Sequence, residues 1–382
     1  MKFTSWCAPG AFSLALAACQ SVPPTVATGT LAFVGTQGSG PGEGIVGVRL
    51  DPATGALASM GVIAQVDRPT WVLADPGHRR LFSVSEVGND GKGHGAVLGF
   101  RYDPESGVLG AIGRADSGGG GPTHLALGRK GRKVFVANYG TGQVSALSLT
   151  SGGTLASVPL AVTSHLGTGP SPRQKGPHAH GVTVDPSGRY LLAPDLGADR
   201  VFVYRLGLGK EVLAPAAVPF VSLPAGSGPR HIVFAPDGRH AFLMTEMGGT
   251  IFSFDWDAGS GKLTQRSLTT LDAANFTGKP SGSELAVSQD GRFLYAGNRA
   301  ANRIQVYAID QSGGLETVQN LDCGGLVPWG FSLTGSGKWL VVANQGSGSL
   351  VVFAVDQATG RLEPTASRLD LARPTSITFT DH

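Results

Sequence analysis

The residues best suited to acid–base chemistry and anion binding occur in four short motifs between residues 178 and 299. They are His178 and His180 in PHAH, Arg230 and His231 in PRH, Glu246 in TE, and Arg299 in NR. Imidazole and carboxylate groups transfer protons near neutral pH, and guanidinium groups bind carboxylates or phosphates through paired hydrogen bonds. If the fold brings these motifs together, they could activate a water molecule beside a bound anionic ligand.

A repeat of roughly 50 residues positions these motifs. Its clearest part is a tight turn between two apolar runs, such as Asp185-Pro186-Ser187-Gly188. The related turns begin at residues 75, 128, 235, 288 and 334. Proline restricts φ and glycine accepts a positive φ, so these turns predict hairpins between antiparallel strands. In residues 176–206 we expect three such strands in succession.

The last repeat is divided between the two ends of the chain. It begins as PTSITFT at Pro374, and the strands that would continue it lie at 31–37 and 44–50. Seven units with such a split indicate a closed ring of blades, because one unit alone cannot bury both faces of its sheet. We therefore predict an all-β fold: a seven-bladed β-propeller over residues 30–382, closed by N- and C-terminal strands that share a blade.

Polar residues gather at one face of the predicted ring, here called the mouth. There the first strand of each blade begins and the second strand ends. The residues expected to bind substrate at the mouth are Arg230, Arg299, Glu86, Asn138, Tyr139, His231 and Gln345. Two alternatives remain open. Asn138, like Asn298 and Asn344, could cap free backbone groups at a blade corner. Glu246 and Arg299 could form a structural ion pair between blades.

Six segments resemble the seven-bladed propeller lactonase family over residues 30–382. They are PHAHG, DLGADRV, GPRHIVF, TEMGGTI, GNRAANRIQVY and PWGF…VANQGSGSLVVF. The family includes 6-phosphogluconolactonases and fungal carboxymuconate lactonising enzymes, so the resemblance implies hydrolysis of a sugar-type lactone. Its site pattern falls on His178 or His180, and on Arg230, Glu246 and Arg299. We expect Glu246 to be the base through water, with His178 or His180 as acid or oxyanion donor. Arg230 and Arg299 would hold an anionic group.

The sequence is compatible with two other functions. One is the cycloisomerase reaction of the same family, which closes a lactone from an unsaturated carboxylic acid. The other is a non-catalytic exported propeller that binds a ligand or a protein, since a fold alone does not define a function. No metal or other cofactor is expected, because no third ligand accompanies His178 and His180 at a characteristic spacing.

The N-terminal segment reads as an export signal. Lys2 and an apolar stretch precede Leu16-Ala17-Ala18-Cys19, which resembles the lipobox of bacterial lipoproteins, with Cys19 as the lipidated residue. We expect a signal peptide at 1–18, a flexible tether at 19–29 and a periplasmic location in the cell envelope. Membrane contact would be through the lipid anchor only; a cytoplasmic location is the alternative.

The charge balance limits the partners. The formal net charge is +3 and no run of lysine or arginine occurs, which disfavours nucleic-acid binding. We expect a monomer whose partner is a small anionic lactone.

Overall fold

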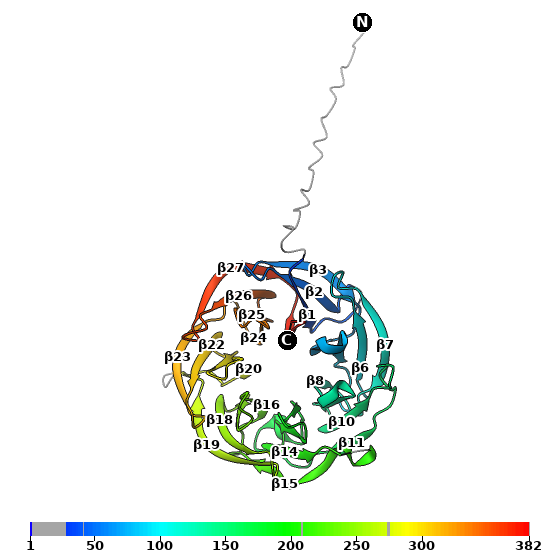
Figure 1. The fold of residues 1–382 in the computed structure, drawn as a ribbon, viewed down its shortest axis with the longest axis vertical. Coiled ribbons are helices and arrows are strands. Elements are labelled where there is room, and N and C mark those ends of the chain that lie inside the picture. Colours follow the sequence, from blue (N-terminus) through cyan, green and yellow to red (C-terminus); the bar gives the residue numbers. More distant parts are fainter. Residues whose placement is uncertain (2–27, 41, 208, 273–275, 382) are drawn as a thin grey trace.

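The computed structural model describes Met1 and residues 28–40, 42–207, 209–272 and 276–381. Within these ranges the strands form seven sheets of four. Figure 1 looks along the ring axis: first strands such as β8, β16, β20 and β24 lie nearest the centre, and fourth strands such as β7, β19 and β23 lie at the rim. The predicted seven-bladed β-propeller is confirmed. Residues 2–27, which contain the proposed signal peptide apart from Met1 and most of the proposed tether, lie outside the described residues.

The first four blades follow one another along the chain. Blade 1 contains β4 (Val72–Asp75), β5 (Arg80–Ser85), β6 (Ala96–Tyr102) and β7 (Leu109–Asp116). Blade 2 contains β8 (Pro122–Leu127), β9 (Lys133–Asn138), β10 (Gln143–Ser148) and β11 (Ala161–Ser164). Blade 3 contains β12 (Thr183–Val184), β13 (Tyr190–Asp195), β14 (Arg200–Arg205) and β15 (Ala214–Ser222). Blade 4 contains β16 (Pro229–Phe234), β17 (His240–Thr245), β18 (Thr250–Asp257) and β19 (Lys262–Thr270).

The remaining blades complete the ring. Blade 5 contains β20 (Gly282–Val287), β21 (Phe293–Asn298), β22 (Arg303–Ile309) and β23 (Leu315–Asp322). Blade 6 contains β24 (Pro328–Leu333), β25 (Trp339–Asn344), β26 (Ser349–Val355) and β27 (Leu362–Asp370). Blade 7 contains β28 (Pro374–Phe379), β1 (Thr30–Thr36), β2 (Ile45–Leu50) and β3 (Leu57–Ala64). The short 3-10 helices are η1 (Pro76–His78), η2 (Arg129–Gly131), η3 (Pro172–Gln174) and η4 (Gly209–Leu213).

Blade 7 closes the ring as predicted. Its inner strand β28 comes from the C-terminus and pairs antiparallel with β1, with Ala32 opposite Phe379 and Val34 opposite Ile377. This pairing completes blade 7, which packs against blade 6 on one face and blade 1 on the other, so both of its faces are buried.

The hydrophobic core lies between neighbouring blades. In one cluster, Leu192 and Val203 of blade 3 pack against Leu243 and Phe254 of blade 4. The second strand of a blade, such as β17, is buried on both faces and reads as a continuous apolar run. The outermost strand β27 alternates between more and less exposed positions, as expected for a strand at the rim. Within the described ranges, no helix is long and apolar enough to span a membrane.

One strand differs from the sequence expectation. The first strand of blade 3 is reduced to the two residues of β12, preceded by an isolated bridge between Ala179 and Asp195. Pro194 accounts for part of this change: its carbonyl accepts the backbone N–H of His180 at 3.0 Å, but proline has no N–H to return. Because the ladder is interrupted, residues 177–180 do not form a regular strand where they reach the mouth.

Candidate active site

The main charged residues of the candidate site stand at the corners of blades 3, 4 and 5. Glu246 directly follows β17, and its backbone N–H donates to Gly228 O at 2.7 Å. Arg299 follows β21 in the same way and donates to Ser281 O at 2.8 Å. These backbone bonds fix the point from which each side chain extends toward the axis.

Three residues from three blades converge on one oxygen of Glu246. Oε2 lies 2.8 Å from Arg299 Nη2, 3.3 Å from Arg230 Nε and 3.6 Å from His180 Nε2. All four side chains are buried. The close approach of blades 3 and 4 depends on Gly181, because a Cβ there would lie 2.6 Å from the carbonyl oxygen of Arg230. The structure thus brings together Glu246, Arg230, Arg299 and His180, as the sequence predicted.

The protonation states at this cluster follow from burial and charge. Burial by itself raises the pKa of Glu246, but its contacts with His180, Arg299 and Arg230 together hold that pKa well below the usual range. Burial, and then the charge of Arg230, lower the pKa of His180 to about 4. Burial, and then the charge of Arg299, lower the pKa of Arg230 to about 10. At neutral pH the cluster therefore contains a carboxylate, charged guanidinium groups and a neutral imidazole.

His178 lies beside this cluster, against the ring of Tyr139. The two rings are stacked with centroids 4.6 Å apart, and His178 Nδ1 is 2.7 Å from the carbonyl oxygen of Tyr139. A carbonyl only accepts, so Nδ1 carries the proton and Nε2 is the lone-pair nitrogen of the neutral ring. The carboxylate of Asp195 accepts the backbone N–H of His178 at 2.8 Å and so fixes the segment. His178 is half-buried, unlike His180.

Arg173 is a site residue that the sequence analysis missed. It lies in η3, in the loop between β11 and β12. Its Nη1 is 2.7 Å from Glu246 Oε1, and its Nη2 donates to Tyr139 Oη at 2.9 Å. The sequence analysis located mouth residues from the ends of the repeated strands, so it could not locate a residue in a long loop. The available signal was a cation a few residues before the PHAH motif.

A second buried layer lies beneath Arg230. His231 Nδ1 is 3.0 Å from both Glu284 Oε1 and Arg230 Nη1, and the rings of His231 and His124 have centroids 4.6 Å apart. Burial is the largest cause of a pKa well below normal for both histidines and of a raised pKa for Glu284. These groups line one end of a cavity of about 340 Å³ among the inner strands. His231, expected to bind substrate, therefore belongs to this lower layer.

Three other expected binding residues have partners away from the Glu246 cluster. Glu86 pairs with Arg68 at 3.6 Å and also accepts hydrogen bonds from Thr70 and Asn89. Gln345 donates to the side chain of Gln37 at 2.7 Å. The third is Asn138, which bonds to Ser117 and Ser145.

Asn138 is fully buried. Its amide donates to Ser117 O at 3.0 Å and to Ser145 Oγ at 3.1 Å. These are the contacts of a corner-capping residue. The geometry therefore favours the alternative role that the sequence analysis left open for it.

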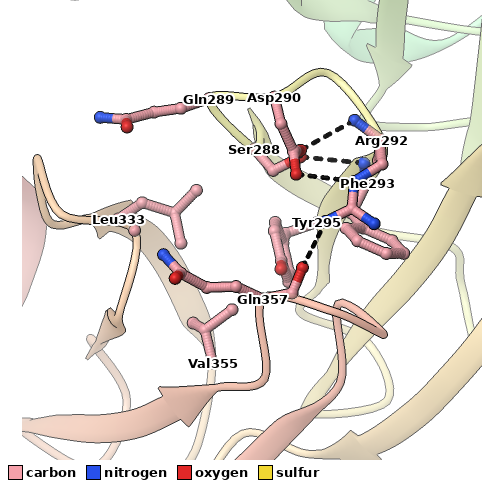
Figure 2. A pocket seen from close by; sticks show the side chains of 10 residues that line it. Ser288, Gln289, Asp290, Arg292, Phe293, Tyr295, Leu333, Val355 and Gln357 are labelled. Carbon is pink, nitrogen blue, oxygen red and sulfur yellow. Dashed lines mark hydrogen bonds and ion pairs between the residues drawn. The ribbon is translucent and has the colours of Figure 1, made fainter.

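A separate hollow of about 270 Å³ lies between blades 5 and 6, at the end of the blades that carries the tight turns (Figure 2). Its charged groups bond to one another: Arg292 Nε is 2.7 Å from Asp290 Oδ2, and Arg292 Nη2 donates to Gln357 O at 2.6 Å. Paired charges on exposed turns offer little to a ligand, so we place the candidate site at the mouth instead. Among the residues that the structure describes, no three His, Cys, Asp or Glu side chains are grouped to hold a metal ion.

The fold and the mouth define a seven-bladed β-propeller with a charged site at one end of its axis. The chain belongs to the lactonase, 7-bladed β-propeller family, which it matches over residues 31–379. It is 31% identical to a 6-phosphogluconolactonase of Bacillus subtilis over 91% of this chain and 98% of that protein. A 6-phosphogluconolactonase of Pectobacterium carotovorum is also 31% identical, over 71% of this chain and 77% of that protein.

A solved structure agrees with this assignment. The periplasmic gluconolactonase of Pseudomonas aeruginosa superimposes with a TM-score of 0.85 at 37% identity, covering 92% of this chain and 98% of that one. The family predicted from the sequence is therefore confirmed.

Proposed function

We propose that this protein hydrolyses the ester bond of a sugar lactone at the mouth of the propeller. The observation that carries the proposal is the ionised Glu246, surrounded by Arg173, Arg230 and Arg299 beside the neutral His180. Ester hydrolysis needs a base that deprotonates water, positive charge that stabilises the oxyanion, and groups that bind the substrate. The relatives named 6-phosphogluconolactonase and gluconolactonase support a sugar lactone as the substrate.

His178 is the proposed base. Its Nε2 has a lone pair because Nδ1–H is engaged by the carbonyl of Tyr139. Nε2 takes a proton from water as the water oxygen bonds to the lactone carbonyl carbon. The tetrahedral oxyanion then collapses, the bond from this carbon to the ring oxygen breaks, and the protonated imidazole returns the proton to that oxygen. Ring opening yields the hydroxy acid, which loses a proton to solvent at neutral pH.

Arg230 and Arg299 are the proposed donors to the oxyanion. A guanidinium group presents several N–H donors in a rigid fork, and each of these side chains contacts Glu246 through only part of that fork. The sequence expectation made Glu246 the base. A carboxylate whose pKa lies well below normal is a weak base, so we propose that Glu246 holds the guanidinium groups in place.

The test is an assay of the purified protein against δ- and γ-lactones of sugar acids, followed by acid release. We expect turnover, with preference for anionic lactones. Lactone formation from an unsaturated carboxylic acid, without hydrolysis, would instead indicate the cycloisomerase. Absence of both reactions, with ligand binding retained, would leave a binding propeller.

The same proposal includes the location. We propose export to the periplasm, with residues 1–18 as the signal, 19–29 as the tether and Cys19 as the lipidated residue, and a monomeric propeller. The periplasmic gluconolactonase of Pseudomonas aeruginosa supports export. Cys19→Ser should move the protein from the membrane fraction to the soluble fraction on fractionation of cells. Equal distribution of the wild type and the variant would contradict the anchor.

A further inference from the structure

Arg173 differs from the other two guanidinium groups on Glu246 in its exposure. Its side chain is 50% exposed, whereas those of Arg230 and Arg299 are 3% and 8% exposed. The two carboxylate oxygens are divided in the same way: Oε2 faces the two buried arginines, and Oε1 faces Arg173. If Arg173 leaves Oε1, Glu246 therefore still has two buried cations at Oε2.

The backbone that carries Arg173 is held firmly. The next residue, Gln174, is fully buried and donates from Nε2 to Leu196 O at 2.8 Å. Ser171 caps η3: its Oγ accepts the N–H of Arg173 at 3.3 Å, and its own N–H donates to Gln174 Oε1 at 3.2 Å. Arg173 can therefore change partners by side-chain rotation alone, without rearrangement of the loop.

The charge at the cluster leaves room for an anion. Three guanidinium groups face the single carboxylate of Glu246, and His180 is neutral because its pKa is about 4. Arg230 and Arg299 are also bound to backbone carbonyls, those of Ser283 at 2.7 Å and Gly282 at 3.1 Å. Arg173 is thus the arginine of the cluster whose guanidinium group is most exposed to solvent.

We infer that Arg173 determines specificity for a lactone that carries a phosphate or carboxylate substituent. On binding, its guanidinium group turns from Glu246 Oε1 to the substrate anion, while Tyr139 Oη, 2.9 Å from Nη2, remains within reach as a second partner. This inference rests on the proposed function and narrows it to an anionic sugar lactone. Its chemistry is the paired hydrogen bonding of a guanidinium group to a planar or tetrahedral oxyanion.

The experiment compares three lactones: gluconolactone, its 6-phosphate, and the lactone with a carboxylate at the same carbon. With Arg173→Gln, we expect kcat/KM for the anionic lactones to fall about 10-fold to 100-fold, mainly through KM. The value for the neutral lactone should change by less than about threefold. The anionic lactone with the larger loss identifies the substituent. Arg173→Lys keeps the charge without the fork and should recover only part of the loss.

Lys175→Gln is the matched control. It removes an exposed positive charge from the same loop, so it should leave the preference for anionic lactones intact. Equal losses on neutral and anionic lactones in Arg173→Gln would overturn the inference, because Arg173 would then act through Glu246. A wild type without preference for anionic lactones would overturn it as well.

Calorimetric binding of 6-phosphogluconate and gluconate separates this inference from the proposed hydrolysis. If the wild type hydrolyses no lactone, the proposed function fails. Preferential binding of the phosphorylated acid, lost in Arg173→Gln, would still support the role of Arg173 as the anion-binding residue. Equal binding of both acids by the wild type would reject that role.

Discussion

Arg299 Nη2 lies 2.8 Å from Glu246 Oε2, and both side chains are only 8% exposed, although the two residues belong to different blades. The ion pair therefore joins blades 4 and 5 at the point where the candidate site is built. Both roles considered for this pair from the sequence, a structural contact between blades and part of an active site, are compatible with this geometry.

Glu246→Gln should reduce stability as well as activity. The substitution removes the counter-charge of buried guanidinium groups, and breaking such a buried pair costs about 3 kcal/mol or more. We expect a lower free energy of unfolding in urea and a fall in kcat of about 100-fold, because Arg230 and Arg299 lose the group that positions them. The exposed Glu363 supplies the control: Glu363→Gln should change stability by less than about 0.5 kcal/mol. A large loss of kcat with unchanged stability would favour Glu246 as the base.

His178→Gln should abolish most turnover without a large effect on folding. Loss of a general base lowers kcat by about 10² to 10⁴-fold, and His178 is only half-buried. His94→Gln changes an exposed histidine that pairs with Asp116 and should leave kcat unchanged. A variant that keeps the wild-type kcat would exclude His178 as the base.

Stability should decline as the pH falls from about 6.5 toward 4. Burial lowers the pKa of His124, His180 and His231 in the folded state, to about 4 for His180. The unfolded chain then binds more protons in this window, so its free energy falls relative to the folded state. The contribution of these histidines to the free energy of unfolding is complete at pH values above their pKa in the unfolded chain. It is lost as the pH falls toward their pKa in the folded state. Each can contribute a slope of up to about 1.4 kcal/mol per pH unit.

Urea unfolding at several pH values measures this slope. His124→Gln should flatten it, because one fewer buried histidine remains to be protonated. Glu284 acts in the opposite direction, since burial raises its pKa and its contribution is lost as the pH rises. An unchanged slope in His124→Gln would contradict the assignment of the acid sensitivity to the buried histidines.

Phe379→Ala should weaken the closure of the ring. Phe379 is on β28, is 1% exposed and packs in the cluster between blades 6 and 7. Truncation of a buried phenylalanine costs about 3 to 5 kcal/mol, so the urea midpoint should fall markedly. Leu326→Ala, at an exposed position, should have an effect below about 0.5 kcal/mol. Deletion of residues 373–382 should cause unfolding or aggregation, and an unchanged melting temperature would contradict the closure.

Much of the architecture could be predicted from local patterns. The turn at Asp185–Gly188 and its counterparts define hairpins through the conformational preferences of proline and glycine, and their regular spacing indicates blades. The last repeat begins at Pro374 and continues near the N-terminus, up to Leu50. It predicted the closure because its missing strands could be identified by their apolar runs. Glu246, Arg230 and Arg299 could be placed at the mouth, since each follows or begins a strand of known register.

The sequence by itself therefore determined the seven blades, their closure and the placement of Arg230, Glu246 and Arg299 at the mouth, because these depend on short-range periodicity repeated along the chain. The tertiary structure decided which of those residues meet. Glu86 and Gln345 occupy equivalent positions to Glu246 but bond to Arg68 and Gln37 instead. Arg173 reaches Glu246 from a loop 73 positions earlier in the chain. Such contacts depend on side-chain direction and loop path, for which no periodic pattern in a sequence exists.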